Sequence, residues 1–375
     1  MIIGILKEES PEQRVSMLPE TVEVLSKMNV TLLVEAGAGL GAFASDDAYE
    51  LAGARLVSKE ELLKQAEMVV KINPPTNDEF SLLRENQLYL AAFNPLFNKE
   101  LVSALAQKRV TSFSMDVIPR TTRAQAMDIL SSMATISGYK AVLAAAQLLP
   151  RFFPMFMTAA GTIKPARVLI LGAGVAGLQA VATSRKLGAV VEVFDVRAAV
   201  KEEVIGLGAK FVEVEGALDD KAAGGYAVEQ TEEFKKKQAQ AIHDHAVKSD
   251  VIICTAQIPG KKAPLLITKE TVDEMMPGSV IIDLAASTDG NCALTKDNET
   301  IVHHGVKIMG ESSFPVSMPS DASKMFGKNV LNFLKLMFTS KDEFFLNWDD
   351  DLILGTCVTR DGEVINERVK ASMNA

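Results

Sequence analysis

Residues 168–180 read Val-Leu-Ile-Leu-Gly-Ala-Gly-Val-Ala-Gly-Leu-Gln-Ala, and this stretch decides the fold of the second half of the chain. An apolar strand runs into glycines spaced G-x-G-x-x-G at Gly172, Gly174 and Gly177, which open a helix. The first glycine permits a tight turn, the second lets the backbone approach a pyrophosphate, and the third allows close helix–strand packing. Free N–H groups at the helix start favour bound phosphate. The stretch predicts a dinucleotide-binding βαβ unit.

A second strand, Val190–Phe194, ends in Asp195, which lies 23 residues after Gly172. A carboxylate at this place accepts hydrogen bonds from a ribose 2′-hydroxyl and repels a 2′-phosphate, so it favours NAD over NADP. Arg197 lies two residues later and weakly favours NADP instead. The alternative, in which the glycines serve only close packing, stays open on the residues alone.

The bulk composition excludes several classes of protein. The 375 residues suggest two domains, and 48% hydrophobic residues can fill two cores. A net charge of −9 without a long basic run argues against nucleic-acid binding. The three cysteines show no metal-binding spacing, which fits a reducing compartment. No signal peptide and no uninterrupted apolar stretch of about 18 residues is apparent, so we expect no direct membrane insertion.

Short apolar strands alternate with amphipathic helices throughout, which is typical of parallel sheets covered on both faces. We therefore predict an α/β fold with two Rossmann-like doubly wound parallel-sheet domains, the first discontinuous. The first domain is expected to span 1–135 plus 320–375, and the NAD(H)-binding domain 136–319. The predicted strands are Ile2–Leu6, Thr31–Glu35, Met68–Ile72, Leu88–Ala92 and Thr111–Ser114, then Arg167–Leu171, Val190–Phe194, Lys210–Val214, Val251–Thr255, Ser279–Asp283 and Val306–Met309.

Helical patterns fill the connections. The predicted helices are Pro19–Met28, Lys59–Gln65, Asn98–Gln107, Ala124–Leu149 and one from Pro319 onward, capped by Ser320 or Asp321. The tail, Leu352–Val358 and Glu363–Ile365, is predicted to form a hairpin that returns to the first domain.

A second glycine-rich stretch begins at Gly37 with the spacing G-x-G-x-G. It leads into Ser45-Asp-Asp rather than straight into a helix. We interpret it as a loop followed by a helix cap, and not as a second nucleotide site.

Several segments resemble one family beyond the glycine motif. The chain looks like the NAD(H)-binding portion of proton-translocating transhydrogenases, a family related to alanine dehydrogenase, over essentially its whole length. The most specific segment, residues 120–132, reads Arg-Thr-Thr-Arg-Ala-Gln-Ala-Met-Asp-Ile-Leu-Ser-Ser. The resemblance implies that Arg120, Gln125, Asp128 and Ser131 hold the nicotinamide carboxamide and ribose, and thereby act in catalysis by positioning. Without the resemblance, Asp128 and Ser131 indicate only a capped helix start.

The segment Gly216–Glu229 resembles the family's mobile loop, with Gly224-Gly225 as a hinge and Tyr226 beside it. An exposed linker with an incidental tyrosine is the alternative. Motif and resemblance together assign these residues to cofactor binding: Gly172, Gly174, Val175, Ala176, Gly177, Asp195, Val196, Arg197, Tyr226 and Gln257.

An amino-acid dehydrogenase of the alanine type needs side chains that bind a carboxylate and move a proton. The resemblance places Arg14 and Lys71 at two of its four positions. The third position falls in residues 88–96, which lack histidine, and the fourth falls on Ser287, with Asp289 two residues away. The proton-handling pair is therefore missing. Arg14 and Lys71 are expected to survive as salt-bridge partners.

The sequence thus favours a transhydrogenase component that binds NAD(H), with hydride passing directly to NADP(H) on a partner subunit. The resemblance implies a homodimer, an NADP(H)-binding beta subunit, membrane-spanning subunits that couple the reaction to proton translocation, and a cytoplasmic location on the inner face of the membrane. An alanine-type dehydrogenase and a non-catalytic NAD-binding module stay open. The histidines at 243 and 245 are predicted to be solvated, and those at 303 and 304 have no acidic partner nearby in sequence, so we expect no metal.

Overall fold

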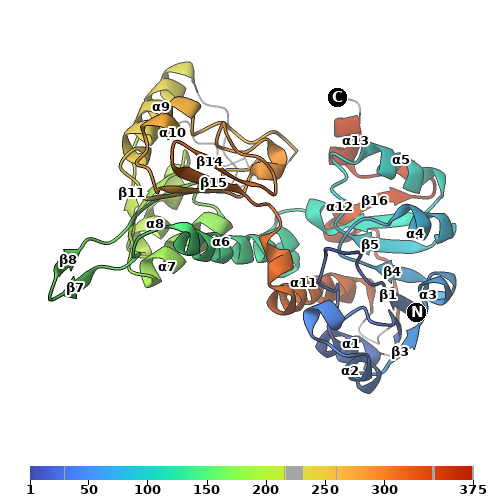
Figure 1. The fold of residues 1–375 in the computed structure, drawn as a ribbon. Helices are drawn as coiled ribbons and strands as arrows, with labels where there is room; N and C mark the ends of the chain where they lie inside the picture. Colours follow the sequence, from blue (N-terminus) through green and yellow to red (C-terminus); the bar gives the residue numbers. More distant parts are fainter. Residues whose placement is uncertain (29, 215, 217–230, 259, 340–342, 374–375) are drawn as a thin grey trace. The chain divides into compact units, whose positions relative to one another are not determined.

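The computed structural model describes all residues except 29, 215, 217–230, 259, 340–342 and 374–375. The backbone divides into two compact units. Unit 1 comprises Met1–Met133 and Pro315–Ala375, and unit 2 comprises Ala134–Phe314 (Figure 1). The C-terminal segment therefore belongs to the same unit as the N-terminus, so this unit is discontinuous in sequence.

Unit 1 is built on an eight-stranded sheet in the order β17-β16-β6-β5-β4-β1-β2-β3. Counted from β1, the six strands β3-β2-β1-β4-β5-β6 are parallel and follow the doubly wound order 3-2-1-4-5-6. The tail adds β16 antiparallel to β6, and β17 antiparallel to β16. The strands are β1 Ile2–Ile5, β2 Thr31–Glu35, β3 Ala54–Val57, β4 Met68–Val70, β5 Leu88–Ala91, β6 Thr111–Ser114, β16 Cys357–Arg360 and β17 Glu363–Val364.

Helices cover both faces of this sheet, because alternate residues of its strands enter different cores. Met68 and Val70 lie in one apolar cluster, whereas Val69 between them lies in the other. The helices of unit 1 are α1 Pro19–Ser26, α2 Asp46–Leu51, α3 Lys59–Gln65, α4 Asn77–Leu82, α5 Lys99–Gln107, α11 Pro319–Leu334, α12 Asp351–Thr356 and α13 Glu367–Met373. The fold class and most predicted strands are thereby confirmed.

Three expectations for unit 1 were wrong in detail. Helix α11 begins at Pro319 after Met318, which makes no side-chain cap, while the Ser320 hydroxyl donates to the Ala42 carbonyl. The tail hairpin is shorter than predicted, because residues 351–356 form helix α12 under the cap of Asp350, whose Oδ1 accepts from two backbone N–H groups. Strand β3 was missed. The predicted cap at Ser45 is confirmed: its hydroxyl accepts from the Ala48 N–H at the start of α2.

Unit 2 has a seven-stranded sheet in the order β11-β10-β9-β12-β13-β15-β14. Its first six strands in this order are parallel, and β14 pairs antiparallel with β15. When the antiparallel β14 is left out of the count, the parallel strands from β9 onward again follow the order 3-2-1-4-5-6. The strands are β9 Arg167–Leu171, β10 Val190–Phe194, β11 Lys210–Phe211, β12 Val251–Cys254, β13 Val280–Asp283, β14 Thr300–His303 and β15 Val306–Gly310. Strand β11 is shorter than predicted, and β14 was missed.

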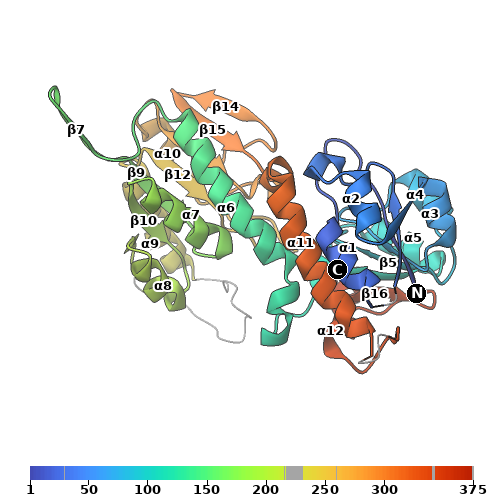
Figure 2. The same ribbon diagram turned by 90° about the horizontal axis from the view of Figure 1, so that it is seen from below.

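The helices of unit 2 are α7 Val175–Lys186, α8 Lys201–Gly206, α9 Glu232–Ala246 and α10 Lys269–Glu274, preceded by α6 Ile129–Leu148, which carries the chain from unit 1 into unit 2. Helix α6 starts later than predicted, because Asp128 is extended and interrupts the helical backbone. Among the described residues, α6 alone is long and apolar enough to cross a membrane. Ala141, Val142 and Ala145 on this helix are buried in the core of unit 2, where the helix lies beside α7 (Figure 2).

A two-stranded hairpin of β7 Phe156–Thr158 and β8 Gly161–Ile163 extends from the body of unit 2 (Figures 1 and 2). All six of its strand residues are exposed, and Met157 keeps 77% of its accessible surface. This hairpin was not predicted from the sequence.

Candidate functional site

The glycine motif lies at the point where the strand order of unit 2 reverses, between β9 and β12. Gly172 follows β9 with φ at +104°, a conformation that favours glycine, and a Cβ there would come within 2.6 Å of Thr255 Oγ1. A Cβ on Gly177 would lie 1.9 Å from the Gly172 carbonyl oxygen. The Thr255 hydroxyl, at the end of β12, donates to that same carbonyl at 2.9 Å. The turn is thus held by contacts that leave no room for side chains.

Gly174 is different, because a Cβ at this position would meet nothing within 4 Å. It precedes α7 and supplies no side-chain cap, so the first N–H groups of the helix, those of Val175, Ala176 and Gly177, face an open approach. Backbone donors and the helix dipole at such a place suit a phosphate group. The residues therefore fit the phosphates of a dinucleotide.

Asp195, directly after β10, is held in an unusually complete set of hydrogen bonds. Its Oδ2 accepts from the Ala173 N–H at 2.7 Å and from Arg197 Nη2 at 2.7 Å. Its Oδ1 accepts from the Arg197 backbone N–H at 2.8 Å and from Arg197 Nε at 2.9 Å. The side chain is only 6% exposed. A carboxylate accepts about four hydrogen bonds, so the Arg197 guanidinium occupies the places that a ribose diol would take.

The loop after β12 carries Gln257, whose Nε2 donates to the Leu284 carbonyl at 3.0 Å. Asn291, fully buried, holds this loop: its Oδ1 accepts from the Ala256 N–H, and its Nδ2 donates to the carbonyls of Ala256 and Pro264. Asn291 lies after β13, far along the chain and outside any motif, so the sequence analysis missed it. Val196 is half-buried beside Asp195. Tyr226 and the rest of the predicted mobile loop, apart from Gly216, lie outside the described residues.

The segment from Arg120 to Ser131 lies in unit 1. Asp128 caps α6, because its Oδ1 accepts from the Ser131 N–H at 3.0 Å and its Oδ2 accepts from the Ser131 hydroxyl at 2.6 Å. These two residues therefore form the capped helix start that the residue pattern indicates by itself. Arg120 and Gln125 are exposed.

The C-terminal segment of unit 1 fixes the short 3-10 helix Thr122–Met127 in this loop. Arg123 forms a two-pronged ion pair with Asp350. The Ala126 carbonyl accepts from the side-chain amides of Asn329 and Asn332 on α11, at 2.9 and 3.0 Å. Gln125 stands between these two anchors with an exposed side chain. The loop presents a polar group from a rigid support, as ligand positioning requires.

The strand order of unit 1 also reverses once, between β1 and β4, and ionised side chains gather there. Arg14 binds both oxygens of Glu12, at 2.8 and 2.6 Å. Lys71, 1% exposed, binds both oxygens of Glu79, at 2.9 and 2.8 Å. The expectation that Arg14 and Lys71 are salt-bridge partners is confirmed. Glu8 accepts from the Ile72 N–H at 2.6 Å and lies 4.0 Å from Lys71.

The match with known proteins covers nearly all of the sequence. Residues 4–137 match the family described as "Alanine dehydrogenase/PNT, N-terminal domain", and residues 141–367 match "Alanine dehydrogenase/PNT, C-terminal domain". The chain belongs to the alanine dehydrogenase/PNT family. The resemblance drawn from the sequence motifs is thereby confirmed.

Relatives within the alanine dehydrogenase/PNT family differ in their sequence identity to this chain. The chain is 47% identical over 377 residues to a Rhodospirillum rubrum protein named as the first portion of NAD(P) transhydrogenase subunit alpha, with 98% of each chain covered. It is 30% identical over 330 residues to the alanine dehydrogenase of Bacillus subtilis, with 85% of this chain and 81% of that one covered. A solved transhydrogenase structure from Sinorhizobium meliloti superposes with a TM-score of 0.89 at 41% identity, covering 97% of this chain and 100% of that one.

Membership in the alanine dehydrogenase/PNT family supports an oxidoreductase role and the binding of a nicotinamide nucleotide. The glycine turn and the open helix start of unit 2 agree with this, because their geometry suits a pyrophosphate and excludes side chains at the turn.

The buried carboxyl of Glu8 gives unit 1 a pH dependence. Burial raises its pKa from 4.5 to about 7, and the nearby Lys71 ammonium only partly opposes this. The folded chain thus keeps a proton that the unfolded chain releases between these values. The free energy of unfolding should therefore fall as the pH rises through this window. We predict that the free energy of unfolding falls between about pH 5 and about pH 8 by on the order of 1–3 kcal/mol more in wild type than in Glu8→Gln.

Urea unfolding followed by tryptophan fluorescence measures this difference, since the single tryptophan, Trp348, packs on the core of unit 1. Glu23→Gln, on the exposed side of α1, is the matched control and should follow wild type. Parallel curves for wild type and Glu8→Gln would show that Glu8 does not titrate in this range.

Proposed function

We propose that this chain is the NAD(H)-binding component of a proton-translocating NAD(P)⁺ transhydrogenase. In this proposal a nicotinamide nucleotide bound on unit 2 supplies or accepts the hydride, and NADP(H) on a partner subunit is the other reactant. The observation that carries the proposal is the 47% identity, over 98% of both chains, to a protein named as a transhydrogenase alpha subunit. The identity to an alanine dehydrogenase is 30% over a smaller share.

The state of the charged side chains in unit 1 supports this choice. An amino-acid dehydrogenase needs an available cation for the substrate carboxylate and a group that moves a proton. Here Glu12 and Glu79 already neutralise Arg14 and Lys71. At the fourth position stands Ser287, and the nearby Asp289 is paired with Lys262 at 2.7 Å on the surface. Direct transfer between two nicotinamides needs no such proton-moving side chain.

Unit 2 is proposed to be the NAD(H)-binding domain. Gly172, Gly174 and Gly177 shape the turn, and the N–H groups of Val175 and Ala176 face the phosphates. Asp195 would accept from the adenosine ribose after the Arg197 guanidinium turns aside. This movement gives up two of the four hydrogen bonds that Asp195 accepts. The backbone of Val196 and the Gln257 loop would border the same nucleotide.

Arg120, Gln125, Asp128 and Ser131 are proposed to hold the nicotinamide carboxamide and ribose, with the loop of one protomer reaching the nucleotide of the other in a homodimer. An amide needs a donor and an acceptor to fix its ring plane, and a glutamine side chain offers both. The anchoring of Ala126 by Asn329 and Asn332 supports this positioning role. The exposed hairpin β7–β8 supports a homodimer, because a second copy would cover its apolar side chains.

The remaining partners are proposed to be an NADP(H)-binding beta subunit and membrane-spanning subunits, which would couple the reaction to proton translocation. They would hold the chain on the cytoplasmic face of the cell membrane. An alanine-type dehydrogenase is the second candidate, favoured by the retention of Arg14 and Lys71. A non-catalytic NAD-binding module is the third.

The deciding experiment mixes the purified chain with NADH, a transhydrogenase partner subunit loaded with NADP⁺, and an oxidised NAD analogue. We expect the analogue to be reduced only when the partner is present. A second reaction offers NAD⁺ with alanine or other amino acids and no partner, and should show no turnover. Turnover there would make the chain an amino-acid dehydrogenase, and inactivity in both reactions would favour a binding module.

Replacing Gln125 with Ala tests the positioning loop in the same assay. The exchange rate should fall by at least about 10-fold, because a loosely held ring seldom reaches the transfer geometry. The affinity for NADH should change by less than about 2-fold, since most contacts are elsewhere on the nucleotide. Gln107→Ala, exposed on α5, is the control. A loss of NADH affinity at an unchanged rate would contradict the assigned role.

Asp195→Ala tests the choice of nucleotide. It removes the acceptors for the ribose and the negative charge that repels a 2′-phosphate. The affinity for NADH, measured through the fluorescence of the nucleotide, should weaken by about 10–100-fold. The ratio of the affinities for NADH and NADPH should decrease. Asp244→Ala, on α9, is the control and should bind like wild type. An unchanged ratio of the two affinities would place the ribose contact on another residue.

A further inference from the structure

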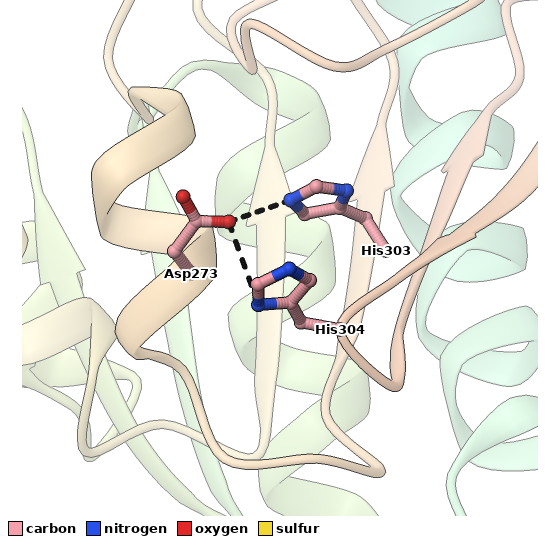
Figure 3. A group of neighbouring side chains, drawn as sticks. All are labelled: Asp273, His303 and His304. Carbon is pink, nitrogen blue, oxygen red and sulfur yellow. Dashed lines mark hydrogen bonds and ion pairs between the residues drawn. The ribbon is translucent and has the colours of Figure 1, made fainter.

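Three metal-ligating side chains meet in unit 2, at the edge of the sheet where β14 turns into β15 (Figure 3). Asp273 comes from helix α10, and His303 and His304 come from the end of β14 and the turn after it. His303 Nε2 lies 2.6 Å from Asp273 Oδ1, and His304 Nδ1 lies 3.7 Å from the same oxygen. All three ligand atoms lie within 4.8 Å of one another.

The two imidazoles lie on the same side because of the turn that joins the strands. Consecutive residues of a strand point to opposite faces. Here His304 has φ at +47° and Gly305 has φ at +80°, so both residues of the two-residue turn are left-handed. The turn brings the rings of His303 and His304 into a stack, with centroids 4.5 Å apart and planes 14° apart. Asparagine, aspartate or glycine is usual at the place of His304.

Helix α10 supplies the acidic partner that the sequence analysis did not find, because Asp273 lies 30 residues before His303. Its other oxygen, Oδ2, accepts from Lys269 at 2.9 Å, and this leaves Oδ1 directed at the two rings. Asp273 and His303 are 29% and 25% exposed, and His304 is 63% exposed. The cluster is therefore reachable from solvent.

Two imidazole nitrogens and one carboxylate oxygen are ligands that suit Zn²⁺ and similar transition cations. Bonds of about 2.1 Å in a tetrahedron place neighbouring ligand atoms roughly 3.4 Å apart. The observed separations from Asp273 Oδ1, 2.6 and 3.7 Å, lie on either side of this value. Forming the coordination geometry requires the side chains to rotate, because the two imidazole planes lie only 14° apart and a shared cation must lie close to both ring planes.

We propose that Asp273, His303 and His304 form a binding site for a divalent transition cation of the Zn²⁺ class, with water in the open coordination positions. The cation replaces the hydrogen bond between His303 and Asp273 and ties the β14–β15 turn to helix α10. This replaces the expectation from sequence that the chain binds no metal. The site uses none of the residues assigned to the nucleotide, so it stands or fails independently of the proposed function.

Calorimetric titration of the tag-free chain with ZnCl₂ near neutral pH tests the site. We expect one cation per chain, and a rise in the unfolding temperature of wild type when Zn²⁺ is added. Asp273→Ala and His303→Ala should each weaken binding by at least about 10-fold. His304→Asn should do the same, and it keeps a residue that tolerates the left-handed turn, so its folding is not at risk.

His245→Ala is the matched control, because His245 lies in the same unit but pairs with Glu192 at 2.8 Å. It should bind Zn²⁺ like wild type. Substituted Co²⁺ should give visible absorption bands in wild type and lose them in His304→Asn. No binding of Zn²⁺ or Co²⁺ by wild type would overturn the proposal. Equal binding by wild type, Asp273→Ala and His304→Asn would overturn it as well.

Discussion

The contact between the backbone of Gly172 and Gly177 is the constraint on which unit 2 depends. The helix after β9 approaches the strand so closely that a Cβ on Gly177 would lie 1.9 Å from the Gly172 carbonyl oxygen. A similar constraint joins α6 to α7, since a Cβ on Gly138 would lie 2.1 Å from the Ala176 carbonyl oxygen. These backbone approaches set the position of α7, and with it the direction of the N–H groups at its start.

The two units share one strand order but treat its reversal point differently. In unit 2 that point is open: Gly174 faces free space and α7 begins without a side-chain cap. In unit 1 it holds Glu8, Arg14 and Lys71, and the cations are neutralised by Glu12 and Glu79. An ion pair buried as deeply as Lys71–Glu79 costs desolvation of both groups and leaves neither charge available to a ligand. The same fold therefore leaves the turn at the reversal point open in unit 2 and surrounds it with ion pairs in unit 1.

The Asp195 carboxylate is held in place by the hydrogen bonds that it accepts. The Ala173 N–H links its carboxylate to the glycine turn, and Arg197 fills its remaining lone pairs. Under the proposed function, ribose binding would exchange these hydrogen bonds rather than add new ones, so its net contribution to affinity would be modest. Under the same proposal, specificity against a 2′-phosphate would come from the negative charge of Asp195, which remains in either arrangement.

The sequence by itself determined the fold class, because periodic apolar strands and the G-x-G-x-x-G spacing are local signals. It also determined the family, since residues 120–132 and the glycine motif are each a continuous stretch of sequence. Element ends were predicted less well: the cap of α12 by Asp350 converted a predicted strand into a helix. Only the tertiary structure decided which residues far apart in the sequence meet. Asn291 with Ala256, Asn329 with Ala126, and Asp273 with His303 are joined by strand order and helix packing, and no sequence spacing encodes these meetings.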